Sequence, residues 1–509
     1  MPKVSSWKIA FVLCAFCLVA AISSPAQTFT TLYSFCSQIN CADGTSPQGE
    51  LVQGTDGNLY GTTDGYGANG SGGTVFKVTT GGSLTTLYSF CDTVGCWQNG
   101  DTPEGPLVLA TNGDLYGTTR GPGAGCPAGG CGTVYKITPA GALTTLYGFC
   151  SQTNCTDGES PNAGLVQATN LDLYGTTEFG GAYPNCYAGL GAVTCGTIFE
   201  ITPRGRLTTL HNFCAQIGCP DGYFPQAASL IQASDGNLYG VTPYGGAYCV
   251  PLGCGTVFKM TLNGTFTTLY SFCESGGNCP DGAVPGYFPG TGPGLVQGSD
   301  GNFYGTTSVG GTYNLGTVFR ITPAGKLKTL YSFDGGTDGA YPQPGLIQAT
   351  DGNFYGITSA GNNAGPSGTI FSMTPGGTLT TLHTFCSEPN CTDGAFPSGG
   401  LVQATNGAFY GTTSEGGASL FDGTVFSLSV GLKPFVETNP TSGKVGTKVT
   451  ILGNNLTGST SVTFNGAPAG FTAHGTYITT TVPSGATTGF VRVTTPSGTL
   501  TSNVKFRVP

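Results

Sequence analysis

The chain has 509 residues, of which 87 are glycine, while Asp, Glu, Lys and Arg together make up only 8%. So much glycine with so few helix-forming charged residues excludes a helical bundle, and an apolar content of 38% is too high for a disordered chain. The net charge is −9 and Lys and Arg are not clustered, which argues against nucleic acid as a partner. The composition therefore predicts an all-β, turn-rich protein.

The N-terminal segment, residues 1–26, has the three regions of a secretory signal peptide. Lys3 and Lys8 precede an apolar run over residues 9–22, and Ser24-Pro25-Ala26 fits a cleavage site of small residues. The run is shorter than a membrane span, and an uncleaved anchor is the alternative. We expect a secreted protein, extracellular or periplasmic, without a membrane span after signal cleavage; the sequence does not predict its oligomeric state.

The cysteines outside this segment fall into nine close pairs. In an exported protein such spacing favours local disulfides, whereas zinc sites usually join two cysteine pairs or add histidine, and the chain has 3 His. We therefore predict disulfides and no metal or other cofactor. The predicted pairs are Cys36–Cys41, Cys91–Cys96, Cys126–Cys131, Cys150–Cys155, Cys186–Cys195, Cys214–Cys219, Cys249–Cys254, Cys273–Cys279 and Cys386–Cys391.

One sequence unit recurs seven times over residues 27–430. Four apolar segments recur in each copy, as at 51–53, 58–63, 73–76 and 84–90, and their β-branched and aromatic residues between Gly, Pro, Asn and Asp indicate strands. Asp-Gly-Asn and Thr-Pro-x-Gly sequences supply tight turns between them. Four antiparallel strands repeated seven times predict a seven-bladed β-propeller. The marker tyrosines of the units are Tyr60, Tyr116, Tyr174, Tyr239, Tyr304, Tyr355 and Tyr410.

The two ends of the repeat region predict how the ring closes. The mature chain begins with a copy of the fourth segment at residues 30–35, and the last unit stops after its third segment at residues 423–426. We expect the N-terminal strand to complete the last blade and to close the propeller.

The unit Leu-Val-Gln-Ala-Thr-Asp-Gly-Asn-Leu/Phe-Tyr-Gly-Thr-Thr, followed by Gly-Thr-Val-Phe, resembles the Gloeo/Verruco (GloVer) tandem repeat of choice-of-anchor bacterial exported proteins. The resemblance covers about residues 28–430, and a more distant one links the unit to NHL-type and streptogramin-lyase-type propellers. It implies an exported bacterial protein but no biochemical activity, and the usual C-terminal anchor of such proteins is not recognised here.

Residues 431–433 link the repeats to a different pattern at residues 434–509. Short strands without cysteine alternate with turns there, which predicts an immunoglobulin-like β-sandwich. The stretch from Asn439 to Leu456, with Val482-Pro483-Ser484-Gly485 and Ser502-Asn503-Val504, resembles an IPT/TIG domain. Such domains resemble spacers and adhesion modules in exported bacterial proteins, and this copy lacks basic loops for DNA.

Two loops of each repeat are expected to share one rim of the propeller. One is the crossing between repeats, with Cys-x4-Cys before Asp/Asn-Gly-x-x-Pro, and the other joins the second and third strands and varies in length. Variable loops on a rigid scaffold favour this rim as a binding surface, although stabilised turns are the alternative. The carboxylates that could bind there are Asp64, Glu178, Glu415 and Asp422.

Other recurring polar residues have competing explanations. The Asp of each Asp-Gly-x-x-Pro motif could bind calcium, but one carboxylate per motif favours a turn. The first-strand glutamines could line a polar site, but hydrogen bonds to one another or to neighbouring backbone are favoured, and the marker tyrosines are expected to pack between sheets. These glutamines are Gln53, Gln167, Gln232, Gln297, Gln348 and Gln403, with Leu109 interrupting the series.

Catalysis has little support in the sequence. His211 and His383 replace a tyrosine of the fourth strand and His474 lies beyond the repeats, so no histidine is left for proton transfer at the rim. We predict no catalytic residue and favour an exported, non-catalytic binding or scaffold protein whose disulfide-stapled rim contacts glycan or protein. The alternatives are an extracellular polysaccharide lyase or hydrolase using rim carboxylates and a purely structural extracellular protein.

Overall fold

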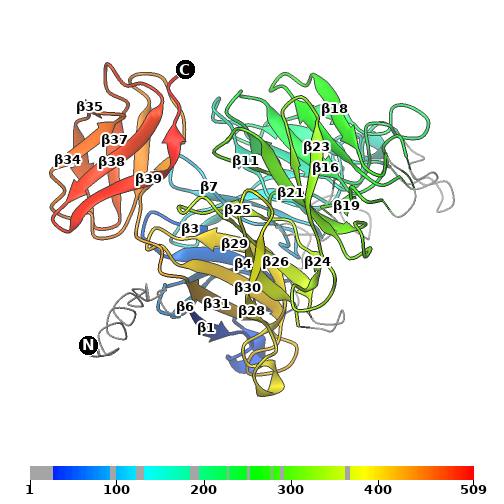
Figure 1. Cartoon of the computed structure of the whole chain (residues 1–509), viewed down its shortest axis with the longest axis horizontal. Helices are drawn as coiled ribbons and strands as arrows, with labels where there is room; N and C mark the ends of the chain where they lie inside the picture. The colour runs from blue at the N-terminus through cyan, green and yellow to red at the C-terminus, as the bar shows by residue number, and fades with distance from the viewer. Residues whose placement is uncertain are drawn as a thin grey trace, which may run out of the picture.

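Strands make up nearly all of the regular structure (Figure 1). The computed structural model describes residues 27–509 except 71, 92–98, 122–130, 184–193, 226–228, 249–252, 275, 277–278, 287–291 and 362–366. The predicted signal peptide, Cys96, Cys126, Cys186 and Cys249 thus lie outside the described residues. No helix formed by the described residues has the length and apolar character needed to cross a membrane.

The first repeat shows how one unit folds. Its second, third and fourth segments form adjacent antiparallel strands, and the innermost strand is interrupted, so that two short pieces pair with the same neighbour. Tyr60 pairs with Lys77 in the register of the second and third strands. These strands are β2 (Thr45–Pro47), β3 (Val52–Gln53), β4 (Leu59–Gly65), β5 (Thr74–Val78) and β6 (Leu84–Ser89).

The next five repeats form five further antiparallel sheets with the same strand order, and the innermost strand is again in two pieces in the fifth and sixth repeats. Their strands are β7 (Val108–Leu109), β8 (Leu115–Thr119), β9 (Thr133–Ile137) and β10 (Leu143–Gly148); β11 (Val166–Gln167), β12 (Leu173–Thr177), β13 (Thr197–Ile201) and β14 (Leu207–Asn212); β15 (Ile231–Gln232), β16 (Leu238–Thr242), β17 (Thr256–Met260) and β18 (Phe266–Ser271); β19 (Ala283–Pro285), β20 (Val296–Gln297), β21 (Phe303–Val309), β22 (Thr317–Ile321) and β23 (Leu327–Ser332); β24 (Ala340–Pro342), β25 (Ile347–Gln348), β26 (Phe354–Ala360), β27 (Thr369–Met373) and β28 (Leu379–Thr384). The described 3-10 turns are η1 (Ile39–Cys41), η2 (Thr153–Cys155) and η4 (Pro389–Cys391).

The sheet of the last repeat contains strands from both ends of the repeat region. β29 (Ala395–Gln403), β30 (Phe409–Glu415) and β31 (Thr424–Ser429) are joined by the N-terminal strand β1 (Thr28–Ser34). β1 runs antiparallel to β31, with Thr28 opposite Ser429 and Ser34 opposite Thr424. Figure 1 shows this dark-blue strand beside the gold strands of the last repeat. The N-terminal strand therefore completes the last sheet. The repeat region is β-propeller-like, since it consists of tandem antiparallel sheets of this kind.

Paired threonines explain the recurring Thr-Thr and Gly-Thr sequences. The last threonine of each second strand and the first threonine of each third strand are buried and hydrogen-bonded through their hydroxyls, at 2.8 or 2.9 Å. A buried hydroxyl needs such a partner, so each pair fixes the register of its two strands. The pairs are Thr63–Thr74, Thr119–Thr133, Thr177–Thr197, Thr242–Thr256, Thr307–Thr317, Thr358–Thr369 and Thr413–Thr424.

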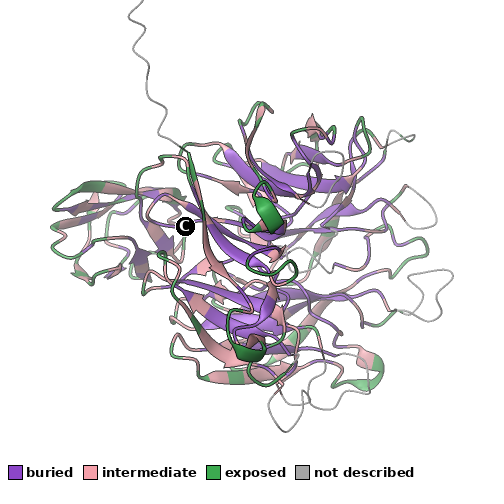
Figure 2. Ribbon diagram, turned by 90° about the horizontal axis from the view of Figure 1, so that it is seen from below, coloured by how far each residue is buried: buried purple, intermediate pink, exposed green. Residues whose placement is uncertain are grey.

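The core lies between neighbouring sheets. Tyr239 packs on Phe303 of the next repeat with 4.1 Å between ring centroids, and Tyr304 and Tyr355 repeat this contact in the following repeats. The tyrosine hydroxyl also has a partner, because Tyr239 donates to Asp235 of its own turn at 2.9 Å. In Figure 2 the strands are largely buried, whereas exposed residues gather in the loops.

The first-strand glutamines join neighbouring repeats by hydrogen bonds. The side-chain oxygen of each accepts a bond of 2.7–3.1 Å from a backbone N–H of the preceding repeat, or of the last repeat in the case of Gln53. This arrangement is the bond to neighbouring backbone that the sequence favours over a polar ligand site. The donors are the N–H groups of Thr405, Thr111, Thr169, Ser234, Ser299 and Thr350, for Gln53, Gln167, Gln232, Gln297, Gln348 and Gln403 respectively.

Residues 434–509 form two four-stranded antiparallel sheets around a shared core. Val449 and Ile451 of one sheet pack with Val462, Phe464 and Val491 of the other. One sheet has the order β32 (Glu437–Asn439), β33 (Lys448–Leu452), β37 (Tyr477–Thr481) and β36 (Phe471–Ala473), and the other β35 (Ala467–Pro468), β34 (Ser461–Phe464), β38 (Gly489–Thr495) and β39 (Gly498–Phe506).

This C-terminal module docks where the glutamine series is interrupted. Leu452 and Tyr477 pack in one cluster with Leu109. Asn439 Nδ2 donates to the carbonyl of Leu109 at 2.9 Å, and Thr476 Oγ1 donates to that of Thr55 at 2.6 Å. Figure 1 shows the orange and red module beside β3 and β7. At the junction of the first two repeats, the module thus adds contacts where leucine replaces glutamine.

Candidate functional site

Two positions of the repeat lie side by side at the end of the sheets that carries the crossing loops. One directly follows the proline of Asp/Asn-Gly-x-x-Pro, and the other directly follows the paired threonine of the second strand. They are neighbours because that proline and that threonine lie opposite one another, as Pro47 and Thr63 do. In the first three repeats both positions are polar and in contact. Gln48 Nε2 donates to Asp64 at 2.8 Å, Arg120 Nη1 to Glu104 at 3.4 Å, and Asn162 Nδ2 to Glu178 at 2.7 Å.

These three pairs form one network, which we call the carboxylate cluster: Gln48, Asp64, Glu104, Arg120, Asn162 and Glu178. Arg120 links the second and third repeats, since its Nη2 lies 3.8 Å from Glu178 Oε2. The first and second repeats are linked electrostatically, because the charge of Glu104 raises the pKa of Asp64. The cluster thus extends over three sheets.

Burial dominates the electrostatics of the cluster. Glu104 and Glu178 are each 7% exposed, and burial raises the pKa of both, opposed by the charge of Arg120. Burial raises the pKa of Asp64 to about 7, with Glu104 adding to the rise and the Gln48 amide opposing it. The side chain of Arg120 is 45% exposed. Arg120 therefore supplies the positive charge for Glu104 and Glu178, two carboxylates that solvent screens poorly.

Several oxygens in and around the cluster lack hydrogen-bond partners among the described residues. Glu104 Oε2 and Asn162 Oδ1 are buried and unpartnered. The corresponding positions of later repeats carry Ser308 and Gln343, whose side-chain oxygens are also buried and unpartnered. Buried polar atoms are normally hydrogen-bonded, so these oxygens have acceptor capacity that no described residue uses.

Glu50 lies beside the cluster, among backbone segments of several repeats. A Cβ added to Gly292 would be 2.5 Å from Glu50 Oε2, and one added to Gly400 would be 3.7 Å from its carboxyl carbon. Burial raises the pKa of Glu50 to about 8. The glycines of the fifth and seventh repeats therefore leave room for this side chain from the first.

The segments that precede the first strands also contact one another from repeat to repeat. Gly49 lies against Pro106, Pro106 against Gly164, Gly164 against Ser229, Ser229 against Gly292, Pro293 against Gly345, Gly345 against Gly400, and Gly399 against Gly49. The segment of the last repeat thus touches that of the first.

The structure separates the four rim carboxylates expected from the sequence. Asp64 and Glu178 belong to the carboxylate cluster. Glu415 ends β30, opposite Ala395, and Asp422 lies beside the Cys36–Cys41 disulfide, accepts a bond from Ser419 Oγ and has its carbonyl bonded to Ser46 N at 2.9 Å. Among the described residues, neither forms a hydrogen bond or an ion pair with the cluster. Sequence reasoning missed Gln48, Glu50, Glu104, Arg120 and Asn162, although comparing the residue after each repeated proline would have found three of them.

The Asp of Asp-Gly-x-x-Pro anchors its loop. Asp43 accepts bonds from Tyr33 Oη at 2.7 Å and from Ser37 N at 3.0 Å. His211 and His383 take the place of that tyrosine, 3.0 and 3.3 Å from Asp221 and Asp393. The equivalent pairs are Tyr88–Asn99, Tyr147–Asp157, Tyr270–Asp281 and Tyr331–Asp338. These side chains are engaged within the loop, as the turn explanation requires.

Five of the neighbouring cysteine pairs are joined by disulfides: Cys36–Cys41, Cys150–Cys155, Cys214–Cys219, Cys273–Cys279 and Cys386–Cys391. Cys91, Cys131, Cys195 and Cys254 are also disulfide-bonded, and the partners predicted for them lie outside the described residues. Disulfides are typical of an oxidising compartment.

Two groups of described side chains have potential metal-ligand atoms close enough together to hold an ion, and both contain these same cysteines. They are Cys254 with Cys273 and Cys279, and Cys36 and Cys41 with Asp422. A disulfide-bonded sulfur is not the thiolate that a metal requires. Over the described part of the chain, the cluster carboxylates form no such grouping.

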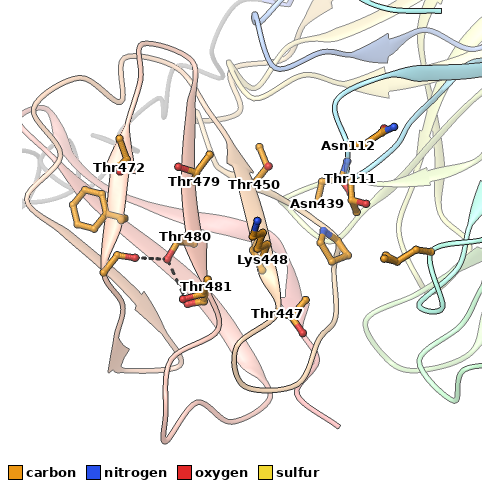
Figure 3. A pocket seen from close by; sticks show the side chains of 15 residues that line it. Thr111, Asn112, Asn439, Thr447, Lys448, Thr450, Thr472, Thr479, Thr480 and Thr481 are labelled. Atoms are coloured by element: carbon orange, nitrogen blue, oxygen red, sulfur yellow. Dashed lines mark hydrogen bonds between the residues drawn. The ribbon is translucent and has the colours of Figure 1, made fainter. Parts of the chain in front are cut away.

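A groove of 910 Å³ lies between the C-terminal module and the repeats. In Figure 3, Thr450, Thr472 and Thr479 lie on the module side, with Thr111 and Asn112 on the other. Lys448 is the charged residue among those that line it. The groove thus offers hydroxyls but no carboxylate, and the carboxylate cluster is the better candidate for specific chemistry.

The chain is a tandem-repeat all-β protein. It belongs to the Gloeobacter/Verrucomicrobia repeat family, which matches residues 18–188 and 287–481. The match extends past residue 430, where the sequence places the end of the repeats. No curated protein matches the chain.

Several solved structures are similar to the chain at low sequence identity and with TM-scores below 0.5. The extracellular domain of a hybrid two-component system from B. thetaiotaomicron is 13% identical with a TM-score of 0.48, over 95% of this chain, which spans only 58% of that one. The PQQ-bound aldose sugar dehydrogenase of Streptomyces coelicolor is 14% identical with a TM-score of 0.37, over 79% of this chain and 98% of that one. No activity is transferred at this level of similarity.

Proposed function

We propose that this chain is an exported, non-catalytic binding protein whose carboxylate cluster contacts a glycan. The repeat region is proposed to be a closed seven-bladed β-propeller. Three observations support closure: β1 pairs with β31, Ser398 Oγ donates to the Pro47 carbonyl at 2.9 Å, and Thr405 N donates to Gln53 at 2.9 Å. Such a ring would bring the polar positions of all repeats around one axis.

The C-terminal module is proposed to be an immunoglobulin-like domain of the IPT/TIG kind that acts as a spacer. Its two sheets and single core support this proposal. The contacts at Leu109 and Thr55 hold it against the repeats, and the cluster lies at the opposite end of the first strands from these contacts, since Glu104 precedes Leu109 and Gln48 precedes Thr55.

The observation that carries the binding proposal is that one oxygen of Glu104 and one of Asn162 are buried without a partner among the described residues of the carboxylate cluster. Folding buries such groups at a cost of ~1–3 kcal/mol each when they lack partners. A sugar offers several hydroxyl donors on a compact ring, and bonds to it would offset that cost. The Cys36–Cys41 and Cys150–Cys155 disulfides constrain the crossing loops that precede Gln48 and Asn162.

A second candidate is an extracellular polysaccharide hydrolase or lyase. It is favoured by Asp64, because a carboxyl with a pKa of about 7 is suited to proton transfer near neutral pH. Glu104 and Glu178 would then be the partner carboxylates. A purely structural role predicts neither binding nor turnover.

A glycan array probed with residues 27–509 tests the proposal, with hits measured by calorimetry. Glu104→Gln should weaken binding by at least about tenfold, whereas Glu415→Gln, a carboxylate outside the cluster, should leave it unchanged. Release of reducing ends that Asp64→Asn abolishes, with the fold intact, would replace the binding proposal by the enzyme. Retention of no glycan at all would refute it.

A further inference from the structure

The carboxylate cluster is undersupplied with positive charge. Arg120 approaches Glu104 at 3.4 Å and Glu178 at 3.8 Å, while the partner of Asp64 is the uncharged amide of Gln48. Glu159 adds further negative charge, because it raises the pKa of Glu178. The two described pairs between lysine and carboxylate, Lys77–Asp56 and Lys136–Asp114, each join a lysine of the third strand to an aspartate of the turn between the first and second strands. The shortage of cations is therefore greatest between Asp64 and Glu104.

The unpartnered atoms point the same way. Asn162 Oδ1 and Gln343 Oε1 are amide oxygens and can only accept hydrogen bonds. The same holds for Glu104 Oε2 when its carboxylate is ionised. Asn162 donates its amide N–H to Glu178, which fixes the orientation of the amide. Its free oxygen is an acceptor and needs a hydrogen-bond donor. A uronate or a sulfated sugar would add acceptors and negative charge to a site that already has an excess of both.

We infer that the cluster binds a glycan that carries free amino groups, with an ammonium group of one sugar between Asp64 and Glu104 and neighbouring hydroxyls donating to the unpartnered oxygens. This inference rests on the proposed glycan binding and narrows its ligand class. An ammonium beside a carboxylate in a poorly screened site forms a charge-assisted hydrogen bond. A lysine side chain presents the same ammonium but no further donors, whereas the free oxygens of Glu104 and Asn162 call for several donors on one compact ligand.

Three oligosaccharides of equal length distinguish the ligand classes: glucosamine, N-acetylglucosamine and galacturonate oligomers, each titrated calorimetrically into residues 27–509 at neutral pH and low salt. We expect the glucosamine oligomer to bind at least about tenfold more tightly than the N-acetylated one, and the galacturonate oligomer not to bind. Raising the salt concentration should weaken the first interaction, because salt screens charge pairs.

Isosteric variants show where the charge acts. Glu104→Gln and Asp64→Asn should each reduce the preference for glucosamine over N-acetylglucosamine to less than about threefold, while Glu415→Gln should preserve it. Since both changes keep the shape of the side chain, unfolding curves should stay close to that of the parent protein and report whether each variant is folded.

The inference fails if the N-acetylated or acidic oligomer binds as tightly as glucosamine, or if the preference for glucosamine survives both variants. Binding of a neutral glycan that depends on Glu104 would then leave the proposed function intact. Tighter binding of an oligolysine peptide than of the glucosamine oligomer would overturn the assignment to a sugar. If no oligosaccharide or array glycan binds, the proposed function falls as well.

Discussion

Gln53 connects the first repeat to the last, and its removal tests the junction directly. Its side-chain oxygen accepts the N–H of Thr405 at 2.9 Å, and its amide donates to the Gly57 carbonyl at 3.1 Å. Gln53 is 4% and Thr405 1% exposed. Thr405 is also held by Asn454, which donates to its hydroxyl at 2.9 Å, and by Phe435, whose N–H donates to its carbonyl at 3.0 Å.

The magnitude follows from the burial of that N–H. In Gln53→Ala the N–H of Thr405 loses its acceptor and stays away from solvent, since its other contacts hold the residue in place. An unpaired buried donor costs ~1–3 kcal/mol, so we expect the free energy of unfolding to fall by ~2 kcal/mol.

Gln232→Ala is the matched control. Gln232 accepts the N–H of Thr169 at 2.9 Å in the same geometry, but Thr169 is exposed, and water can replace the lost bond. We expect this variant to lose under ~1 kcal/mol.

The two variants are compared by urea unfolding and by hydrogen exchange of the segment around residue 405. Gln53→Ala should lower the urea midpoint more than Gln232→Ala and speed exchange at Thr405. Equal losses of stability in the two variants, or unchanged exchange at Thr405, would refute the reasoning.

Three further predictions concern packing, disulfides and pH. Gly61→Ala should cost ~1–3 kcal/mol in urea unfolding, because its Cβ would lie 2.6 Å from a buried phenylalanine ring, whereas Gly81→Ala should be tolerated, since nothing lies within 3.7 Å of its Cβ. Replacing Cys36 and Cys41 together by serine should cost ~2 kcal/mol of stability, and peptide mapping without reductant should recover their disulfide; a bridge to another repeat would contradict the pairing. Burial raises the pKa of Glu50 to about 8, so the folded chain keeps a proton that the unfolded chain releases above its ordinary pKa, and stability should fall as pH rises from about 4.5 to 8. Glu50→Gln should remove ~2 kcal/mol of that loss, a value reduced for partial solvent contact; identical pH profiles of the two proteins would show that Glu50 is not buried as described.

Much of the architecture could be predicted because the chain contains several copies of one sequence unit, which can be compared with one another. β-branched and aromatic segments between Gly and Asp define each strand locally, and seven copies of the same pattern make the assignment consistent. The copy of the fourth segment at the N-terminus likewise predicted the pairing of β1 with β31. Neighbouring cysteines, separated by four residues in most pairs, are close in space whatever the fold.

The candidate site could be predicted only in part, because it lies at positions where the copies differ. Asp64 and Glu178 were recognised as rim carboxylates, but Glu104 and Arg120 join them through contacts between sheets, and spacing along the chain does not encode which side chains of adjacent sheets meet. Glu415 and Asp422 show the same limit, since they share the rim loops in sequence but not the cluster in space.

By itself, then, the sequence determined the all-β class, the seven repeats, the strand order and the family, because these depend on local pattern and its recurrence. Tertiary structure alone decided that one arginine serves carboxylates of two repeats, that Glu50 lies among glycines of distant repeats, and that the C-terminal module packs on Leu109. Each of these is a contact between residues far apart in the chain, set by how the sheets pack rather than by any segment's own propensity.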